Sequence, residues 1–173
     1  LFYCSAFFQV FLSTITLKFF HVINGLALGI KAMKFSEYIQ YDGLGLAKLV
    51  KDKEIHPSEL LQVALEHTHK ANPKLNAIII PMYEQAKQRA QQPLTGTFAG
   101  VPFLVKDLFQ EYQGVPTSYG SNALKRINYT PDFNAEIVNR WEKAGIVTFG
   151  RTNTPEFGIK GITEPDAWGA CHN

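Results

Sequence analysis

The chain has 173 residues, enough for one ordinary domain, and its hydrophobic share of 46% suits a soluble globular protein. Its 17 basic and 15 acidic side chains give a net charge of +2, which is too balanced for a nucleic-acid-binding surface. Two cysteines, Cys4 and Cys171, lie near opposite ends of the sequence. This placement excludes a disulfide framework and a structural zinc site.

A boundary in composition falls near Met33. All 15 acidic residues follow it, and the charged side chains before it are Lys18 and Lys31. Six of the 13 phenylalanines lie in the same early stretch. We therefore expect an apolar extension over residues 1–32 and one structural unit over residues 33–173, which no low-complexity linker divides.

The apolar extension has three interpretations. Its two apolar runs are together long enough to cross a bilayer, but Lys18 and His21 interrupt them near the middle. It also lacks the basic start and the small-residue cleavage site of a signal peptide. The alternatives are a reading frame that begins before the true start at Met33, a genuine membrane or export segment, and a buried helix. We expect a cytoplasmic protein, or a membrane-associated one if the extension is genuine.

Helical patterns dominate the first half of the larger unit. Apolar positions between Phe35 and Lys51 predict a short helix. A clearer helix begins at Pro57, a residue suited to the first helical position, and we expect Asn72 and Pro73 to end it. A polar helix is predicted over Tyr83–Ala90.

Short apolar runs separate these helices. Leu75–Ile80, Val101–Val105 and Ile146–Phe149 predict buried strands. An amphipathic pattern before the last of them predicts a helix that contains Ala135 and is capped by Thr130 or Asp132. Helices alternating with short strands indicate an α/β fold with a largely parallel or mixed sheet.

Lys106 is the candidate functional residue of this pattern. It directly follows the apolar run Val101–Val105, and ligand sites of α/β sheets favour such strand ends. A lysine at the end of a strand is, on its own, most often an ordinary solvated residue. The motifs that surround it must therefore decide its role.

Three motifs give that context. GVPFLVKD spans Gly100–Asp107, PTSYGS spans Pro116–Ser121 and GRTNTPEFG spans Gly150–Gly158. In order and spacing they resemble the amidase signature family, and the resemblance extends from about Asp42 to the last residue. It implies the N-terminal part of that fold, incomplete, with a mixed central sheet flanked by helices. The closing TEPDAWG segment is also similar to amidases that hydrolyse cyclic dimers of nylon oligomers.

The resemblance implies a role for Lys106. In the family the matching lysine belongs to a Ser-cisSer-Lys triad, in which burial favours its neutral amine and lets it accept a proton. The proton comes through the bridging serine, while the second serine attacks the amide carbonyl and forms an acyl-enzyme. Backbone N–H groups of a glycine-rich turn hold the oxyanion.

The same resemblance shows which parts are missing. Both serines lie in the family on a glycine- and serine-rich segment after the motif that resembles WGACHN, and this sequence contains no such segment. We therefore expect this chain alone to be inactive. Asp107 is expected to influence Lys106 or to have a structural hydrogen-bonding role, and Ser121 to support the lysine site or form a turn. Phe157 and Gly158 match a region that lines the acyl pocket.

Other functions are also compatible with the sequence. The expected partner is a small-molecule amide, and the full-length form could be a homodimer. Alternatives are a non-catalytic amidase-derived fragment or binding module, a Schiff-base lysine at Lys106, and one subunit of a glutamine amidotransferase. No cofactor is expected, because phosphate loops and dinucleotide fingerprints are absent. No metal is expected either, since His67 and His69 are two residues apart and point in different directions.

Overall fold

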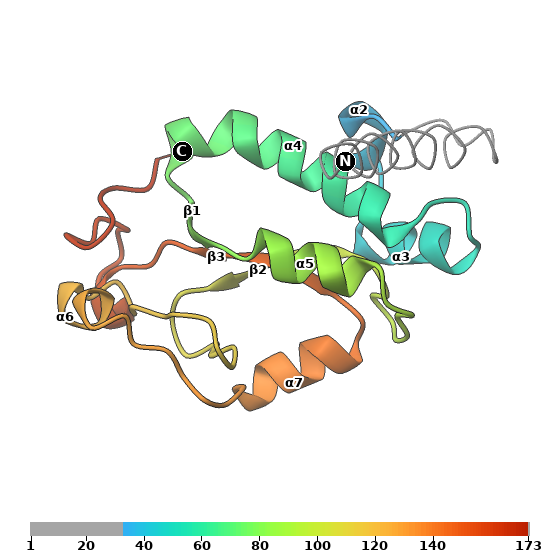
Figure 1. Ribbon diagram of the computed structural model, residues 1–173. Helices are drawn as coiled ribbons and strands as arrows, with labels where there is room; N and C mark the ends of the chain where they lie inside the picture. Colours follow the sequence, from blue (N-terminus) through green and yellow to red (C-terminus); the bar gives the residue numbers. More distant parts are fainter. Residues whose placement is uncertain (1–32, 173) are drawn as a thin grey trace, which may run out of the picture. The chain divides into compact units, whose positions relative to one another are not determined.

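The computed structural model describes residues 33–172 (Figure 1). The three interpretations of residues 1–32 lie outside these described residues. Within residues 33–172, no helix combines the length and the apolar character that crossing a bilayer requires.

Helices and strands alternate along the described chain. The elements are α2 (Phe35–Tyr38), α3 (Gly43–Lys51), α4 (Pro57–Leu75), β1 (Ile78–Pro81), α5 (Tyr83–Ala90), β2 (Pro102–Lys106), α6 (Asn122–Arg126), α7 (Glu136–Lys143), β3 (Val147–Thr152) and a 3₁₀ turn (Glu156–Gly158). The α/β class expected from the sequence is confirmed.

The strands form a mixed sheet in the order β1-β3-β2. β1 runs antiparallel to β3, whereas β2 runs parallel to it, with Lys106 opposite Thr152 at the end of the register. Because β2 and β3 are parallel, their carboxyl ends meet at one edge of the sheet. The residues that follow both strands are therefore neighbours there.

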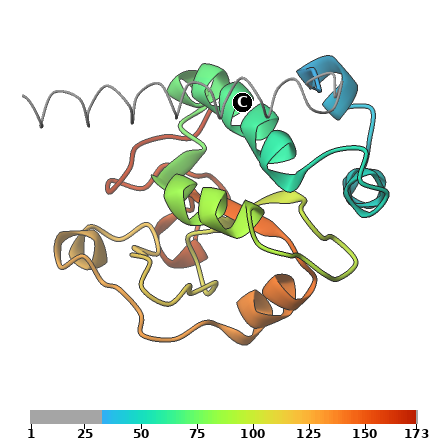
Figure 2. The same cartoon turned by 45° about the vertical axis from the view of Figure 1, so that its right-hand side comes forward.

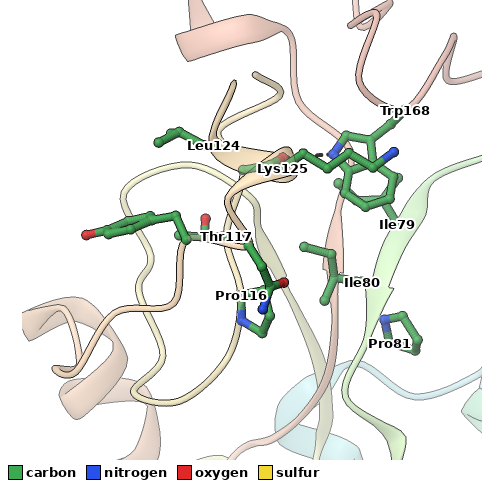
Figure 3. A pocket seen from close by; sticks show the side chains of 11 residues that line it. Ile79, Ile80, Pro81, Pro116, Thr117, Leu124, Lys125 and Trp168 are labelled. Carbon is green, nitrogen blue, oxygen red and sulfur yellow. Dashed lines mark hydrogen bonds between the residues drawn. The ribbon is translucent and has the colours of Figure 1, made fainter. Parts of the chain in front are cut away.

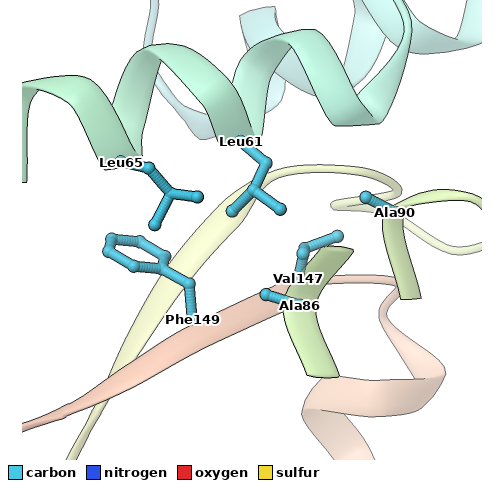
Figure 4. Packing of buried hydrophobic residues seen from close by; sticks show 6 residues of the cluster. All are labelled: Leu61, Leu65, Ala86, Ala90, Val147 and Phe149. Atoms are coloured by element: carbon cyan, nitrogen blue, oxygen red, sulfur yellow. The ribbon is translucent and has the colours of Figure 1, made fainter. Parts of the chain in front are cut away.

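Helices cover both faces of this sheet. α4 and α5 pack on one face around a buried apolar cluster (Figure 4), formed by Leu61, Leu65, Ala86, Ala90, Val147 and Phe149. Leu104 packs against this cluster, whereas its neighbour Phe103 contacts Trp141 of α7 with ring centroids 5.2 Å apart. Since successive strand residues face opposite sides, α7 covers the other face. Both views show this layering (Figure 1 and Figure 2).

The predicted helix over Phe35–Lys51 is divided in two. Asp42 accepts a hydrogen bond from the backbone N–H of Gly45 at 2.7 Å and so caps a new helix, α3. Leu46 and Ala47 of α3 pack with Leu60 of α4 in a second buried cluster. The side-chain cap therefore decides where this part of the chain starts a helix again.

Three further boundaries differ from the sequence predictions. α4 continues through Pro73, because a proline in the last turn costs little and Asn76, at φ 49°, then ends the helix. β1 begins only at Ile78 and is half-buried rather than buried, since it lies at the edge of the sheet. α7 begins at Glu136 without a side-chain cap, so neither Thr130 nor Asp132 caps it.

Replacing Asp42 with alanine is expected to lower the free energy of unfolding by about 1 kcal/mol, because the first turn of α3 loses its capping acceptor. Chemical denaturation of the two proteins measures the difference. Asp132→Ala, which removes an exposed carboxylate outside any helix, is the matched control. Equal losses in both variants would contradict the capping role.

Candidate functional site

Lys106 is the last residue of β2, and its side chain is exposed. Its backbone is held from both sides: the N–H donates to Gln110 Oε1 at 2.6 Å, and the carbonyl accepts from Arg151 Nη1 at 3.3 Å. The ammonium group has no hydrogen bond or ion pair within residues 33–172. The expectation of a buried lysine is therefore wrong for this part of the chain, because no described element covers the end of β2 where Lys106 lies.

Asp107 points away from Lys106 and is completely buried. Its carboxylate accepts hydrogen bonds from Thr117 Oγ1 at 2.7 Å, from Ser118 Oγ at 2.5 Å and from the Ser118 N–H at 3.1 Å. These bonds attach the loop of the PTSYGS motif to the end of β2. Of the two roles expected for Asp107, the structure supports the structural hydrogen-bonding one.

Arg151 lies beside this carboxylate and is also completely buried, with Nη1 3.7 Å from Asp107 Oδ1. Its guanidinium also donates to the carbonyl of Gln110 at 2.9 Å, while Nε lacks a hydrogen-bond partner among the described residues. Burial lowers the pKa of Arg151, and the negative charge of Asp107 opposes that shift. The pair thus fixes the turn that follows β2.

Trp168 joins a third motif to the same network. Its indole Nε1–H donates to Ser118 Oγ at 2.8 Å. The side chain of Asn76 donates to the carbonyl of Trp168 at 2.8 Å, and that of Asn153 donates to the carbonyl of Gly169 at 3.1 Å. Trp168 therefore does more than pack: it connects the TEPDAWG segment to the loop that Asp107 holds.

Ser121 is buried at the start of α6, where its N–H donates to the carbonyl of Ser118 at 2.8 Å. Its side chain forms no capping hydrogen bond. Within the described chain no hydrogen bond joins Ser121 to Lys106, so this serine shapes the turn of the PTSYGS loop.

Phe157 and Gly158 are exposed in the 3₁₀ turn. The N–H of Phe157 donates to the carbonyl of Tyr119 at 2.7 Å, and the rings of these residues lie 6.2 Å apart. Phe109 lies 5.3 Å from Tyr119 on the other side, so the three aromatic rings form one surface group. Burial is the main cause that raises the pKa of Tyr119, whose hydroxyl donates to Glu111. The aromatic group was not foreseen from the sequence.

A model of the Amidase family matches residues 59–173. The chain belongs to the amidase family. It is 42% identical over 132 residues to a 6-aminohexanoate-cyclic-dimer hydrolase of Paenarthrobacter ureafaciens, a match that covers 76% of this chain and 27% of that protein. It is 35% identical over 135 residues to one component of the glutamyl-tRNA(Gln) amidotransferase of Pseudomonas entomophila (strain L48), a match that covers 74% of this chain and 27% of that component.

The fold of this amidase-family chain matches that of a solved relative. A structure of 6-aminohexanoate cyclic dimer hydrolase superimposes with a TM-score of 0.74 at 41% identity, covering 77% of this chain and 27% of the solved one. The chain thus spans about a quarter of the length of these relatives. The amidase fold inferred from the sequence motifs is confirmed, and the chain represents part of it.

Metal ligands are not gathered in the described part of this amidase-family chain: residues 33–172 contain no group of three or more His, Cys, Asp or Glu side chains that could hold an ion. His67 and His69 are exposed, and each contacts an aromatic ring, Phe35 and Tyr83 respectively. They are surface histidines, as the sequence predicts.

Proposed function

We propose that Lys106 is the general base of a site that hydrolyses a small amide, in a protein that supplies the serines of the amidase triad in addition to the residues described here. One observation supports this assignment above the others. Lys106 has a free, exposed ammonium group on a backbone that Gln110 and Arg151 hold from both sides. A base needs a fixed position and an uncommitted nitrogen, and this arrangement supplies both.

The remaining residues have separate roles in the proposal. Asp107 positions the chain on which Lys106 lies, and Ser121 shapes the loop that Asp107 holds. Phe157 and Gly158 contribute to the wall of the acyl pocket. Support for a close approach of backbone comes from Gly158, at φ 70°, where an added Cβ would lie 2.7 Å from Leu108 Cδ2.

In the proposed reaction Lys106 accepts a proton from a bridging serine, which in turn takes the proton of the nucleophilic serine. That serine attacks the amide carbonyl, the amine leaves, and water hydrolyses the acyl-enzyme. The similarity to a cyclic-dimer hydrolase makes small linear or cyclic amides the first substrates to test. A cytoplasmic setting is part of the proposal and agrees with the free thiol of Cys171.

The test compares the 173-residue chain with a longer product of the same reading frame that includes a glycine- and serine-rich segment. Both are assayed with a linear amide and a cyclic amide dimer, and mass spectrometry detects acyl-enzyme. We expect hydrolysis and an acyl adduct for the longer form alone. A longer form that contains the segment but hydrolyses neither amide contradicts the proposal.

The similarity to a component of an amidotransferase provides a second candidate, in which the same lysine serves glutamine hydrolysis. Release of ammonia from glutamine in the same assay distinguishes the two. Hydrolysis of the amide panel without use of glutamine favours the small-amide hydrolase, and the reverse result favours the amidotransferase component.

A further inference from the structure

A pocket of about 220 Å³ lies between β1 and the loop that carries the PTSYGS motif (Figure 3). Lys106 is not among the residues that line it. Its walls are mostly apolar and come from Ile79, Ile80, Pro81, Pro116 and Leu124. In Figure 3, Ile80 faces Pro116 across the space, and Lys125 and Trp168 lie together at one end.

Lys125 is the one charged residue in the lining of this pocket. Its Nζ lies 3.7 Å from the centroid of the Trp168 ring and also donates to the carbonyl of Ala167. Among the described residues it forms no ion pair. An ammonium group has three donors, so this arrangement positions the charge and leaves donor capacity toward the pocket.

The other polar groups nearby are already engaged. The hydroxyls of Thr117 and Ser118 both donate to the buried Asp107, and Ser118 Oγ also accepts from Trp168. They therefore have no donor left for a ligand. The pocket thus combines apolar walls with a single unpaired positive charge, and this is complementary to a molecule with an apolar tail and one negative head group.

We propose that this pocket binds a short linear aliphatic monocarboxylate, with the carboxylate on Lys125 and the alkyl tail between Ile80 and Pro116. At roughly 30 Å³ per group, the space holds about seven non-hydrogen atoms, which is the size of pentanoate. The site is separate from the proposed hydrolysis at Lys106, so it stands or falls independently of that activity.

The experiment titrates the ¹⁵N-labelled full chain with pentanoate and follows the indole N–H signals of Trp168 and Trp141 by NMR. Trp141 packs on Phe103 and does not line the pocket, so it is an internal control. We expect saturable shifts of the Trp168 signal with a Kd on the order of 1 mM, and no shift of Trp141. Pentylamine, which has the same tail and the opposite charge, and acetate, which has the head group alone, are expected to cause no saturable shift.

Variants of the two neighbouring cations test the role of charge. Lys125→Met is expected to weaken pentanoate binding at least tenfold, and Lys125→Arg to retain it. Arg126→Met, which removes an adjacent exposed charge that does not line the pocket, is expected to bind within twofold of the unchanged chain. Equal shifts with pentanoate and pentylamine, or full binding by a folded Lys125→Met protein, overturn the proposal.

Discussion

Replacing Asp107 with alanine is expected to lower the free energy of unfolding by about 3–5 kcal/mol. The change leaves the buried guanidinium of Arg151 without its anion, and it leaves the donors of Thr117 and Ser118 without an acceptor. Unpaired buried charges and donors are among the most destabilising defects in a folded protein. Urea denaturation followed by circular dichroism measures the loss.

Two further variants show where that loss arises. Asp166→Ala removes an exposed carboxylate of the TEPDAWG segment and is expected to change stability by no more than about 0.5 kcal/mol. Adding Arg151→Met to Asp107→Ala removes the unpaired charge and is expected to recover part of the loss. If Asp107→Ala alone costs less than about 1 kcal/mol, the buried network does not hold the loop as described.

Local signals in the sequence were sufficient for much of the fold. Apolar runs identified all the strands, and the helix Tyr83–Ala90 has the predicted bounds. Alternation along β2 also predicted that Asp107 would face away from Lys106 and have a structural role. These features depend on short stretches of chain, and the periodicity of one stretch records them.

Features that depend on distant contacts were not predicted. Arg151 is a charged residue inside a strand, and its burial is tolerated only because the chain brings Asp107 and the carbonyl of Gln110 beside it. The pairing of Trp168 with Ser118 likewise joins residues 50 positions apart. The exposure of Lys106 differs from the family-based expectation because residues 33–172 form only part of the amidase fold.

Replacing Lys106 with alanine, in a longer form that hydrolyses an amide, is expected to reduce kcat/KM by about 100- to 10,000-fold. Removing a general base raises the barrier for the chemical step, whereas the exposed side chain has no hydrogen bond or ion pair in the described chain to lose. The free energy of unfolding is therefore expected to stay within about 0.5 kcal/mol. Arginine at this position keeps the charge but cannot act as a base, so Lys106→Arg is expected to be as inactive as the alanine variant.

The ratio of kcat/KM between the unchanged protein and Lys106→Ala, measured with one amide substrate, tests the central claim most directly. Lys160→Ala, which changes an exposed lysine close in sequence to Gly158, is the matched control. We predict a loss of at least 100-fold for Lys106→Ala and no more than twofold for Lys160→Ala. A ratio within threefold for Lys106→Ala would show that the exposed lysine at the end of β2 is not the base.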